Sequence, residues 1–415
     1  MLDDFDTFAN PAEIKPNPVS QPQHPAEKSF LLLCLRPRTD RSHLTQIHEL
    51  LENPLDWEYL YNFAEYHGLA PFFYHQLNKL DLDNLPLDFL KRLKRSYQKN
   101  VARSIVLTDE LVSLTRELQA IGVESVPYKG PLLGVAAYGD PALRCFIDLD
   151  IIVRPTDVPA ATEILTARGY RTSRRLDTRQ EQMLIAAQHN IQFERKGGQM
   201  IVELHWRVSA DLFAEFQTEE IWERLETISL NDVPLRSIPI EHLLFALCIH
   251  GSRHVWDRFS QICDIAALIG SRTIDWNLLM SLATKTDTER MLLLGLCLAG
   301  SLAEELLPAD ITERIVGDRQ INRLADLVMK RLFSGTTVAK LSLREVFNYN
   351  ILVRKSWPAR ARYCLFALSP ADADLETLGL PRFLNFAYYG LRPLRLMLSA
   401  SRRKTDPGVR SSSSR

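Results

Sequence analysis

The chain has 415 residues, and its length, composition and charge exclude several classes of protein. It is too long for one ordinary hydrophobic core, so we expect two or three domains. Apolar residues make up 46% and charged residues 24% of the sequence, which is typical of a globular protein in water. The formal net charge of −1 excludes a global attraction to nucleic acid or acidic membranes, so local arginines and lysines must hold any anionic ligand.

The sequence predicts a cytoplasmic protein without a transmembrane segment. Its acidic start, Met-Leu-Asp-Asp-Phe-Asp, has neither the basic residues nor the apolar core of a signal peptide. The longest apolar run, from Met291 to Ala303, is shorter than the roughly 20 residues that a membrane-spanning helix needs. Six scattered cysteines without a C-x-x-C pair are typical of buried thiols in a reducing compartment.

Hydrophobic periodicity divides the chain into five segments. Residues 1–28 are rich in proline and poor in apolar residues, which predicts a disordered arm. Helical spacing of apolar residues predicts an N-terminal helical region over 29–119 and a larger C-terminal helical domain over 237–400. Between them, 120–236 mixes short strands with helices and forms an α/β core. Residues 401–415 are basic and serine-rich, which predicts a disordered tail.

Within the α/β core, alternating apolar and polar residues predict the strands of a small sheet. Strands are expected over 123–128 and 146–153, followed by a helix over 157–168 that ends at a glycine. Two further runs, 191–195 and 200–206, flank Lys-Gly-Gly-Gln, which is a strong hairpin signal. The fold class is therefore α+β, with a small mixed sheet flanked by helical regions.

Three acidic residues lie on these predicted strands. Asp148 and Asp150 are two residues apart, so their side chains leave the same face of the strand. Two carboxylates this close repel each other and stay ionised most easily when cations lie between them. Mg²⁺, or alternatively Mn²⁺, suits such a site, and two ions would clamp an in-line displacement at phosphorus. Glu203, on a second strand, is placed to supply a third acid.

A purely structural interpretation of the acidic pair remains open, because Asp-x-Asp also occurs on ordinary strand edges. Apolar residues flank each aspartate, however, and they flank Glu203 in the same way. Such strands are expected to be partly buried, where an unpaired carboxylate is costly. The pattern therefore favours a functional site over a solvated surface.

Basic residues close to the acids are candidates for binding phosphate. Lys129 and Gly130 follow a predicted strand and precede a predicted helix, where free N–H groups and the helix dipole can meet an anion. Arg144 lies four residues before Asp148. We expect Lys129 and Arg144 to neutralise a triphosphate or a leaving pyrophosphate.

Histidines near these segments admit several interpretations. His250 and His254 share one face of a predicted helix. With Asp257 they could form a zinc site, or belong to a packed polar network. The preferred interpretation is that His250, Arg253 and Arg258 line a cleft between the helical domain and the sheet and contact base, ribose or acceptor.

His205 shares a strand face with Glu203, two residues away. It could orient Glu203 through a hydrogen bond, and this ranks above a role as a catalytic base. A core histidine with satisfied hydrogen bonds is the equal alternative.

The ordered combination of motifs resembles a largely uncharacterised nucleotidyltransferase family of the polymerase-beta-like superfamily. The core motifs are Tyr128-Lys129-Gly130, Tyr138-Gly139-Asp140-Pro141, Arg144, Asp148-Leu149-Asp150-Ile151-Ile152-Val153, Arg168-Gly169-Tyr170 and Glu203-Leu204-His205-Trp206. The helical motifs are Trp57, the turn from His67 to Pro71, and Leu247 to Gly251 with His254, Trp256, Arg258 and Asp264. Together these motifs cover most of residues 30–270.

The resemblance implies a polymerase-beta-like sheet, binding of a nucleoside triphosphate with Mg²⁺, and nucleotidyl transfer. By position it implies that Asp148, Asp150 and Glu203 are metal ligands. Three features depart from the wider superfamily: Pro131 replaces a residue with an N–H, 18 positions (148 − 130) separate Gly130 from Asp148, and the third acid is a glutamate. These departures concern phosphate geometry and substrate more than metal binding.

The acceptor and a non-catalytic alternative stay open at this point. The acceptor is a small molecule, a protein or a tRNA, and the near-neutral charge argues mildly against a large nucleic-acid footprint. Alternatively, the protein senses nucleotides or binds a partner on the same fold without catalysis, which Pro131 favours. The basic amphipathic segment 381–398 is suited to peripheral contact with a membrane or a protein, or to docking on its own chain.

Overall fold

The computed structural model describes residues 24–172, 189–195, 197–207 and 218–368. Through Lys355 the described residues form one compact unit, and a second unit begins at Ser356. The predicted basic segment 381–398 and the predicted tail lie outside the described residues. The first helix begins at Pro25, inside the arm predicted over residues 1–28. Proline suits the first turn of a helix, where its missing N–H is not needed. The domain boundaries predicted at 119/120 and 236/237 stay predictions.

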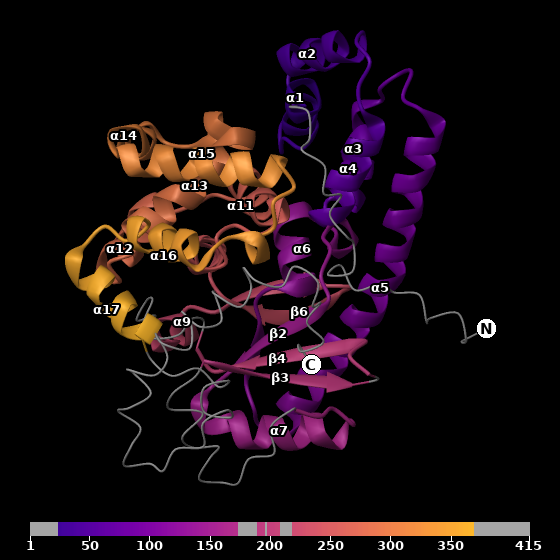
Figure 1. Ribbon diagram of the computed structural model, residues 1–415. Coiled ribbons are helices and arrows are strands. Elements are labelled where there is room, and N and C mark those ends of the chain that lie inside the picture. Colours follow the sequence, from indigo (N-terminus) through magenta and orange to yellow (C-terminus); the bar gives the residue numbers. More distant parts are fainter. Residues whose placement is uncertain (1–23, 173–188, 196, 208–217, 369–415) are drawn as a thin grey trace, which may run out of the picture. The chain divides into compact units, whose positions relative to one another are not determined.

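Five helices form the N-terminal part of the first unit. They are α1 (Pro25–Cys34), α2 (Arg41–Leu51), α3 (Trp57–Tyr66), α4 (Ala70–Leu80) and α5 (Leu87–Ala120). Aspartate N-caps begin two of them, since Asp40 accepts a hydrogen bond from the His43 N–H and Asp56 accepts one from the Tyr59 N–H. The long helix α5 leads directly to the sheet (Figure 1).

A four-stranded mixed sheet follows α5. It consists of β1 (Ser125–Pro127), β2 (Asp148–Val153), β4 (Met200–His205) and β3 (Asn190–Arg195), in that spatial order. The central strands β2 and β4 are parallel, and the outer pairings are antiparallel. The predicted β3–β4 hairpin is confirmed, and its turn uses Gly197 and Gly198 at φ values of 64° and 87°. Helix α6 (Gly130–Tyr138) and the short 3₁₀ turn Pro141–Leu143 connect β1 to β2.

The two faces of this sheet have different partners. Leu149, Ile151 and Val153 of β2 point to one face, where they join a core with residues of α5 and α7 (Val158–Ala167). Figure 1 shows α7 covering that face. The period of two sends Asp148 and Asp150 to the opposite face. Burial of the apolar face therefore fixes which way the acids point.

A second hairpin and a set of helices complete the described chain. The hairpin joins β5 (Glu226–Leu230) to β6 (Val233–Ser237) through Asn231 and Asp232, both left-handed, and follows the short helix α9 (Thr218–Glu223). The helices are α10 (Ile240–Arg253), α11 (Phe259–Ser271), α12 (Trp276–Lys285), α13 (Glu289–Ala303), α14 (Ala309–Gly317), α15 (Arg319–Phe333), α16 (Leu343–Leu352) and, in the second unit, α17 (Trp357–Leu368).

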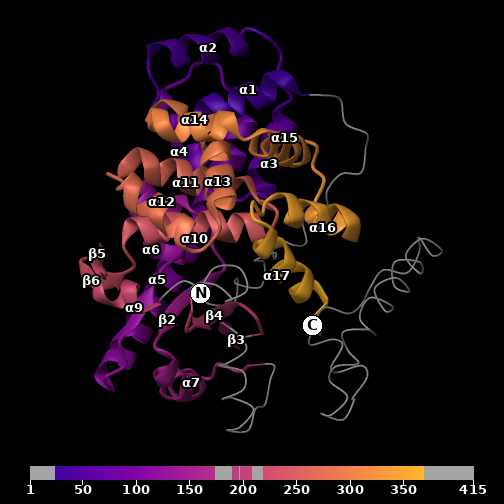
Figure 2. The same ribbon diagram turned by 90° about the vertical axis from the view of Figure 1, so that its left-hand side faces the viewer.

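The helices α10, α11 and α13 pack on one another, and α11 also packs on α6 (Figure 2). Their contact surfaces are formed by fully buried apolar side chains such as Leu244, Ile265 and Leu294. The predicted α+β class, with a small mixed sheet flanked by helices, is confirmed. Within the described part of the chain, no helix is both long and apolar enough to cross a membrane.

A buried ion-pair network connects α5 to the sheet. Glu110 accepts hydrogen bonds from Arg168 and Arg195 and from the hydroxyl of Tyr170. The Arg168 Nη2 and Arg195 Nη2 atoms lie 2.8 Å from its two oxygens, and the Glu110 side chain is 9% exposed. Arg168 also pairs with Glu117, whose side chain is 45% exposed.

The substitution Glu110→Gln is expected to lower the free energy of unfolding by about 3 kcal/mol, because its amide nitrogen would face a buried arginine donor. The matched control Glu117→Gln removes an exposed partner of the same arginine and should cost under about 1 kcal/mol. Urea unfolding followed by circular dichroism measures both. Equal losses for the two variants would contradict this role for Glu110.

Candidate active site

Asp150 and Glu203 lie opposite each other on neighbouring parallel strands. Asp150 of β2 is in register with Glu203 of β4, and Asp148 is in register with Ile201. Asp150 is 4% exposed, whereas the Glu203 side chain is 26% exposed. The strand register therefore places a buried and a partly accessible carboxylate side by side on the face that carries the acids.

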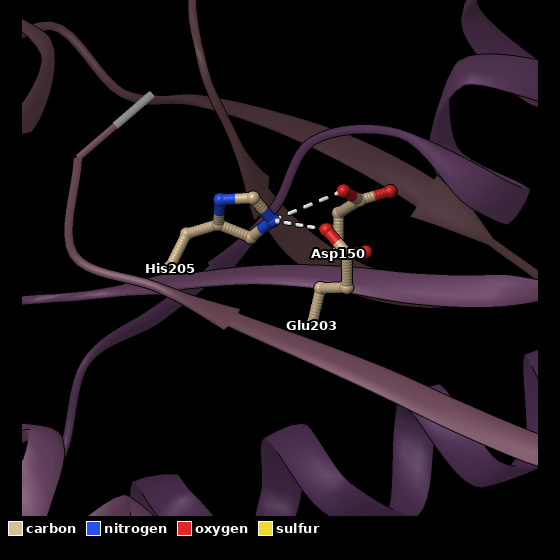
Figure 3. A group of neighbouring side chains, drawn as sticks. All are labelled: Asp150, Glu203 and His205. Atoms are coloured by element: carbon tan, nitrogen blue, oxygen red, sulfur yellow. Dashed lines mark hydrogen bonds and ion pairs between the residues drawn. The ribbon is translucent and has the colours of Figure 1, made fainter. Parts of the chain in front are cut away.

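His205 contacts both carboxylates. Its Nε2 atom lies 3.1 Å from Asp150 Oδ1 and 3.3 Å from Glu203 Oε2 (Figure 3). Burial alone would lower the pKa of His205, but hydrogen bonds to the two carboxylates outweigh it and raise this pKa. The contact with Glu203 expected from the sequence is confirmed, and the contact with Asp150 is additional.

Lys129 contacts the same carboxylate of Asp150. Its Nζ lies 3.2 Å from Asp150 Oδ1 and 4.9 Å from the centre of the Tyr128 ring. Burial alone would lower the pKa of Lys129, but the charge of Asp150 outweighs it and raises the pKa. Lys129 is therefore a fixed positive charge at the start of α6.

The two aspartates differ in their electrostatic surroundings. Burial, followed by repulsion from Asp150 and Glu203, raises the pKa of Asp148 to about 6. Burial would also raise the pKa of Asp150, but Lys129 and the hydrogen bond from His205 lower it well below the usual range. An added divalent cation would favour the ionised form of Asp148, because it would offset that repulsion.

The donor atoms of Asp150, Glu203 and His205 are spaced for one metal ion. Each residue offers a ligand atom, and these atoms all lie within 4.8 Å of one another. Neighbouring ligands of an octahedral ion with bonds of about 2.1 Å are about 3 Å apart, which is close to the 3.1 and 3.3 Å distances at Nε2. The donor set therefore fits a divalent cation. Asp148 is not in this group, and its role as a metal ligand stays a prediction.

Gly130 brings the start of α6 against β2. Its φ of 53° is left-handed, and a Cβ there would lie 3.4 Å from the backbone oxygen of Asp148. Pro131 occupies the first turn of α6 and contributes no N–H. The candidate phosphate turn thus lies directly beside the acidic pair.

Arg144 is bound to α11. Its Nε donates to Asp264 Oδ2 at 3.0 Å, and the Tyr138 hydroxyl donates to Asp264 Oδ1 at 2.8 Å. Burial would lower the pKa of Arg144, but Asp264 outweighs it and raises the pKa. The arginine therefore connects the loop before β2 to the C-terminal helices, and its predicted contact with phosphate stays a prediction.

His250 and Arg253 lie on the last turn of α10. Burial and the positive charge of Lys129 lower the pKa of His250, whose ring centre lies 4.4 Å from that of His254. Asp150 opposes that shift, and burial lowers the pKa of Arg253 against an opposing influence of Tyr128. The structure thus brings His250 near Lys129 and Asp150, whereas the contact of Arg253 with nucleotide or acceptor stays a prediction.

Arg258 lies elsewhere. Its guanidinium donates to the backbone oxygen of Tyr66 and lies 4.2 Å from the centre of the Tyr66 ring, at the end of α3. The predicted contact of Arg258 with nucleotide or acceptor stays a prediction. Among the described residues, His250, His254 and Asp257 do not form a metal-compatible group, so the zinc alternative has no support.

A family model described as "Uncharacterised nucleotidyltransferase" matches residues 53–304. The chain belongs to this family. The resemblance inferred from the motifs is thereby confirmed, and the matched region contains every predicted site residue from Lys129 to Arg258.

One solved structure is similar to part of the chain. An antigenic nucleotidyltransferase-like protein from Paracoccidioides brasiliensis has a solved structure that is similar to 54% of this chain and 92% of its own length. The sequence identity is 14% and the TM-score is 0.29. No curated protein matches the chain.

Two further polar residues lie beside the site of this nucleotidyltransferase family member. The Asn190 Nδ2 donates to Glu203 Oε2 at 3.0 Å, and the ring of His189 lies 6.0 Å from that of His205. Neither residue was predicted from the sequence, because both precede the apolar part of the edge strand β3. The signal that could have found Asn190 is its pairing with His205 across the hairpin, which follows once the register is known.

Nitrogen coordination by His205 is testable by metal titration. Imidazole suits later first-row ions more than Mg²⁺, so His205→Asn should weaken Co²⁺ binding roughly tenfold or more and change Mg²⁺ binding much less. Calorimetry and the visible absorption of Co²⁺ measure this. The control His75→Asn, at an exposed position on α4, should leave both affinities unchanged. Equal loss of both metals in His205→Asn would contradict nitrogen coordination.

Proposed function

We propose that the protein is a Mg²⁺-dependent nucleotidyltransferase that moves a nucleotidyl group from a nucleoside triphosphate to an acceptor hydroxyl. The observation that carries this proposal is the alignment of Asp150 with Glu203 on the central parallel strands, beside Lys129 and the start of α6. Family membership supports a transferase activity. The acceptor is a small molecule, a protein or a tRNA.

In this proposal the acidic residues hold the divalent cation. Asp148, Asp150 and Glu203 are the proposed ligands, and Mn²⁺ is the alternative to Mg²⁺. When bound, the cation would polarise the phosphoryl group and offset its negative charge. Without a bound cation, His205 Nε2 hydrogen-bonds the carboxylates of Asp150 and Glu203. With a cation bound, this nitrogen would lose its proton and could serve as a further ligand.

Basic groups are proposed to bind the rest of the nucleotide. Lys129 and the N–H of Gly130 would contact the phosphates, and Arg144 would stabilise charge on the leaving pyrophosphate. His250 and Arg253 on α10 would contact the base, the ribose or the acceptor, and Arg258 is the more distant candidate.

The proposed step is an in-line displacement at the α-phosphorus. The acceptor oxygen forms a new P–O bond while the bond to pyrophosphate breaks. The acceptor hydroxyl would be activated by the cation or by Glu203, and its proton passes to Glu203 or to water. Glu203 suits this role because its carboxylate is the partly accessible one of the aligned pair. The lowered pKa of Asp150 keeps the other carboxylate ionised throughout.

Release of pyrophosphate tests the proposal. The protein with Mg²⁺ or Mn²⁺, labelled nucleotide triphosphates and an acceptor panel should release pyrophosphate, and Asp150→Asn should lower the rate roughly a hundredfold or more. The control Asp232→Asn changes an exposed acid at φ 62°, a conformation that asparagine also adopts. The proposal is wrong if Asp150→Asn retains full turnover.

A non-catalytic nucleotide sensor is the second candidate, favoured by one observation. Pro131 stands in the first turn of α6 and removes a possible phosphate donor from the turn. Calorimetry that shows metal-dependent nucleotide binding, without turnover across a broad acceptor panel, would favour the sensor over the enzyme.

Both the enzyme and the sensor must bind nucleotide, and a substitution at Lys129 tests this binding. Lys129→Met should raise the dissociation constant for nucleoside triphosphate roughly tenfold, because a phosphate-facing cation is lost. The control Lys79→Met, at an exposed position on α4, should bind normally. Unchanged affinity in Lys129→Met would remove this lysine from the proposed phosphate site.

A further inference from the structure

The turn after α10 has an unfavourable backbone conformation. Val255 and Trp256 are consecutive residues with φ values of 54° and 57°. Neither is a glycine, and a β-branched valine is rarely found in the left-handed region. Such a turn persists only where its surroundings hold it. It directly follows the helical turn that carries His250 and Arg253.

Arg331 on α15 holds this turn through its carbonyl groups. Its Nη2 donates to the Val255 oxygen at 2.7 Å and to the Trp256 oxygen at 2.6 Å, and its Nη1 donates to the Thr336 oxygen at 3.2 Å. The side chain is buried, with a residue exposure of 9%. A planar guanidinium with several fixed donors can bind two successive carbonyls in a way that a lysine ammonium cannot reproduce.

The indole of Trp256 fixes the same turn from the other side. Trp256 is fully buried, and its backbone N–H donates to the Gly251 oxygen at 2.7 Å. A Cβ on Gly251 would lie 2.5 Å from the indole, and one on Gly295 would lie 3.1 Å from it. The ring therefore fills space that glycines on α10 and α13 leave open, and α13 in turn packs against α15 (Figure 2).

Together these contacts restrain the end of α10 and the residues that it presents. We propose that Arg331 is a positioning residue of the nucleotide site, which holds the turn after α10 so that His250 stays beside Lys129 and Asp150. This proposal rests on the proposed function. The influence of Lys129 and Asp150 on the pKa of His250 is consistent with that placement.

The proposal extends the site beyond the family region. The family match ends at residue 304, whereas Arg331 lies on α15, which begins at Arg319. A part of the chain outside the match would thus determine the geometry of residues inside it.

Hydrogen exchange tests whether Arg331 holds the turn. In Arg331→Lys and Arg331→Met, the amides of His254, Val255 and Trp256 should exchange roughly tenfold faster or more, while those of β2 and β4 stay unchanged. The control Lys330→Met, exposed on the same helix, should exchange like the unmodified protein. Unchanged exchange at the turn would overturn the proposal, and the lysine variant keeps the test available if the methionine variant does not fold.

A double-mutant cycle tests whether the turn acts on nucleotide binding through α10. Arg331→Lys alone should raise the nucleotide dissociation constant roughly tenfold, but only about twofold when introduced into His250→Ala. Additive losses would show that Arg331 stabilises the fold without positioning His250, and would overturn the proposal. If the unmodified protein binds no nucleotide, the proposed function fails and the positioning role fails with it, whereas the exchange result still reports on the turn.

Discussion

The structure depends on one electrostatic constraint, the close approach of two carboxylates on the central strands of a small sheet. Asp150 and Glu203 are brought together by the parallel register of β2 and β4, not by proximity in sequence. Buried carboxylates at this spacing need compensating charge. In the described structure Lys129 supplies a positive charge and His205 hydrogen-bonds Asp150. Asp150, Glu203 and His205 also lie close enough together to bind a divalent cation, which would supply further positive charge.

Side chains alternate along β2, so its apolar residues and its acidic residues lie on opposite faces of the sheet. Leu149, Ile151 and Val153 bury one face of β2 against α5 and α7, so Asp148 and Asp150 must project from the other. The network around Glu110 fastens α5 to this arrangement. A rigid apolar layer therefore lies directly behind the polar site, which is the condition for holding charged groups in fixed geometry.

Much of this arrangement could be predicted from local sequence, and the rest depended on contacts distant in the chain. Alternation predicted the face of Asp148 and Asp150, and the Lys-Gly-Gly-Gln turn predicted the hairpin that carries Glu203. The partners of arginines could not be predicted in this way, because Arg144 binds Asp264 120 residues away and Arg258 binds Tyr66 192 residues away. His205 was expected to contact Glu203, but its contact with Asp150 required the strand register. Arg331 gave no local signal at all.

Anomalous diffraction from crystals grown with Mn²⁺ and a non-hydrolysable nucleoside triphosphate tests the central claim most directly. We expect a manganese peak between the carboxylates of Asp150 and Glu203, with the triphosphate extending toward Lys129 and Gly130. A manganese peak at another group of residues, or a nucleotide bound away from the start of α6, would contradict it.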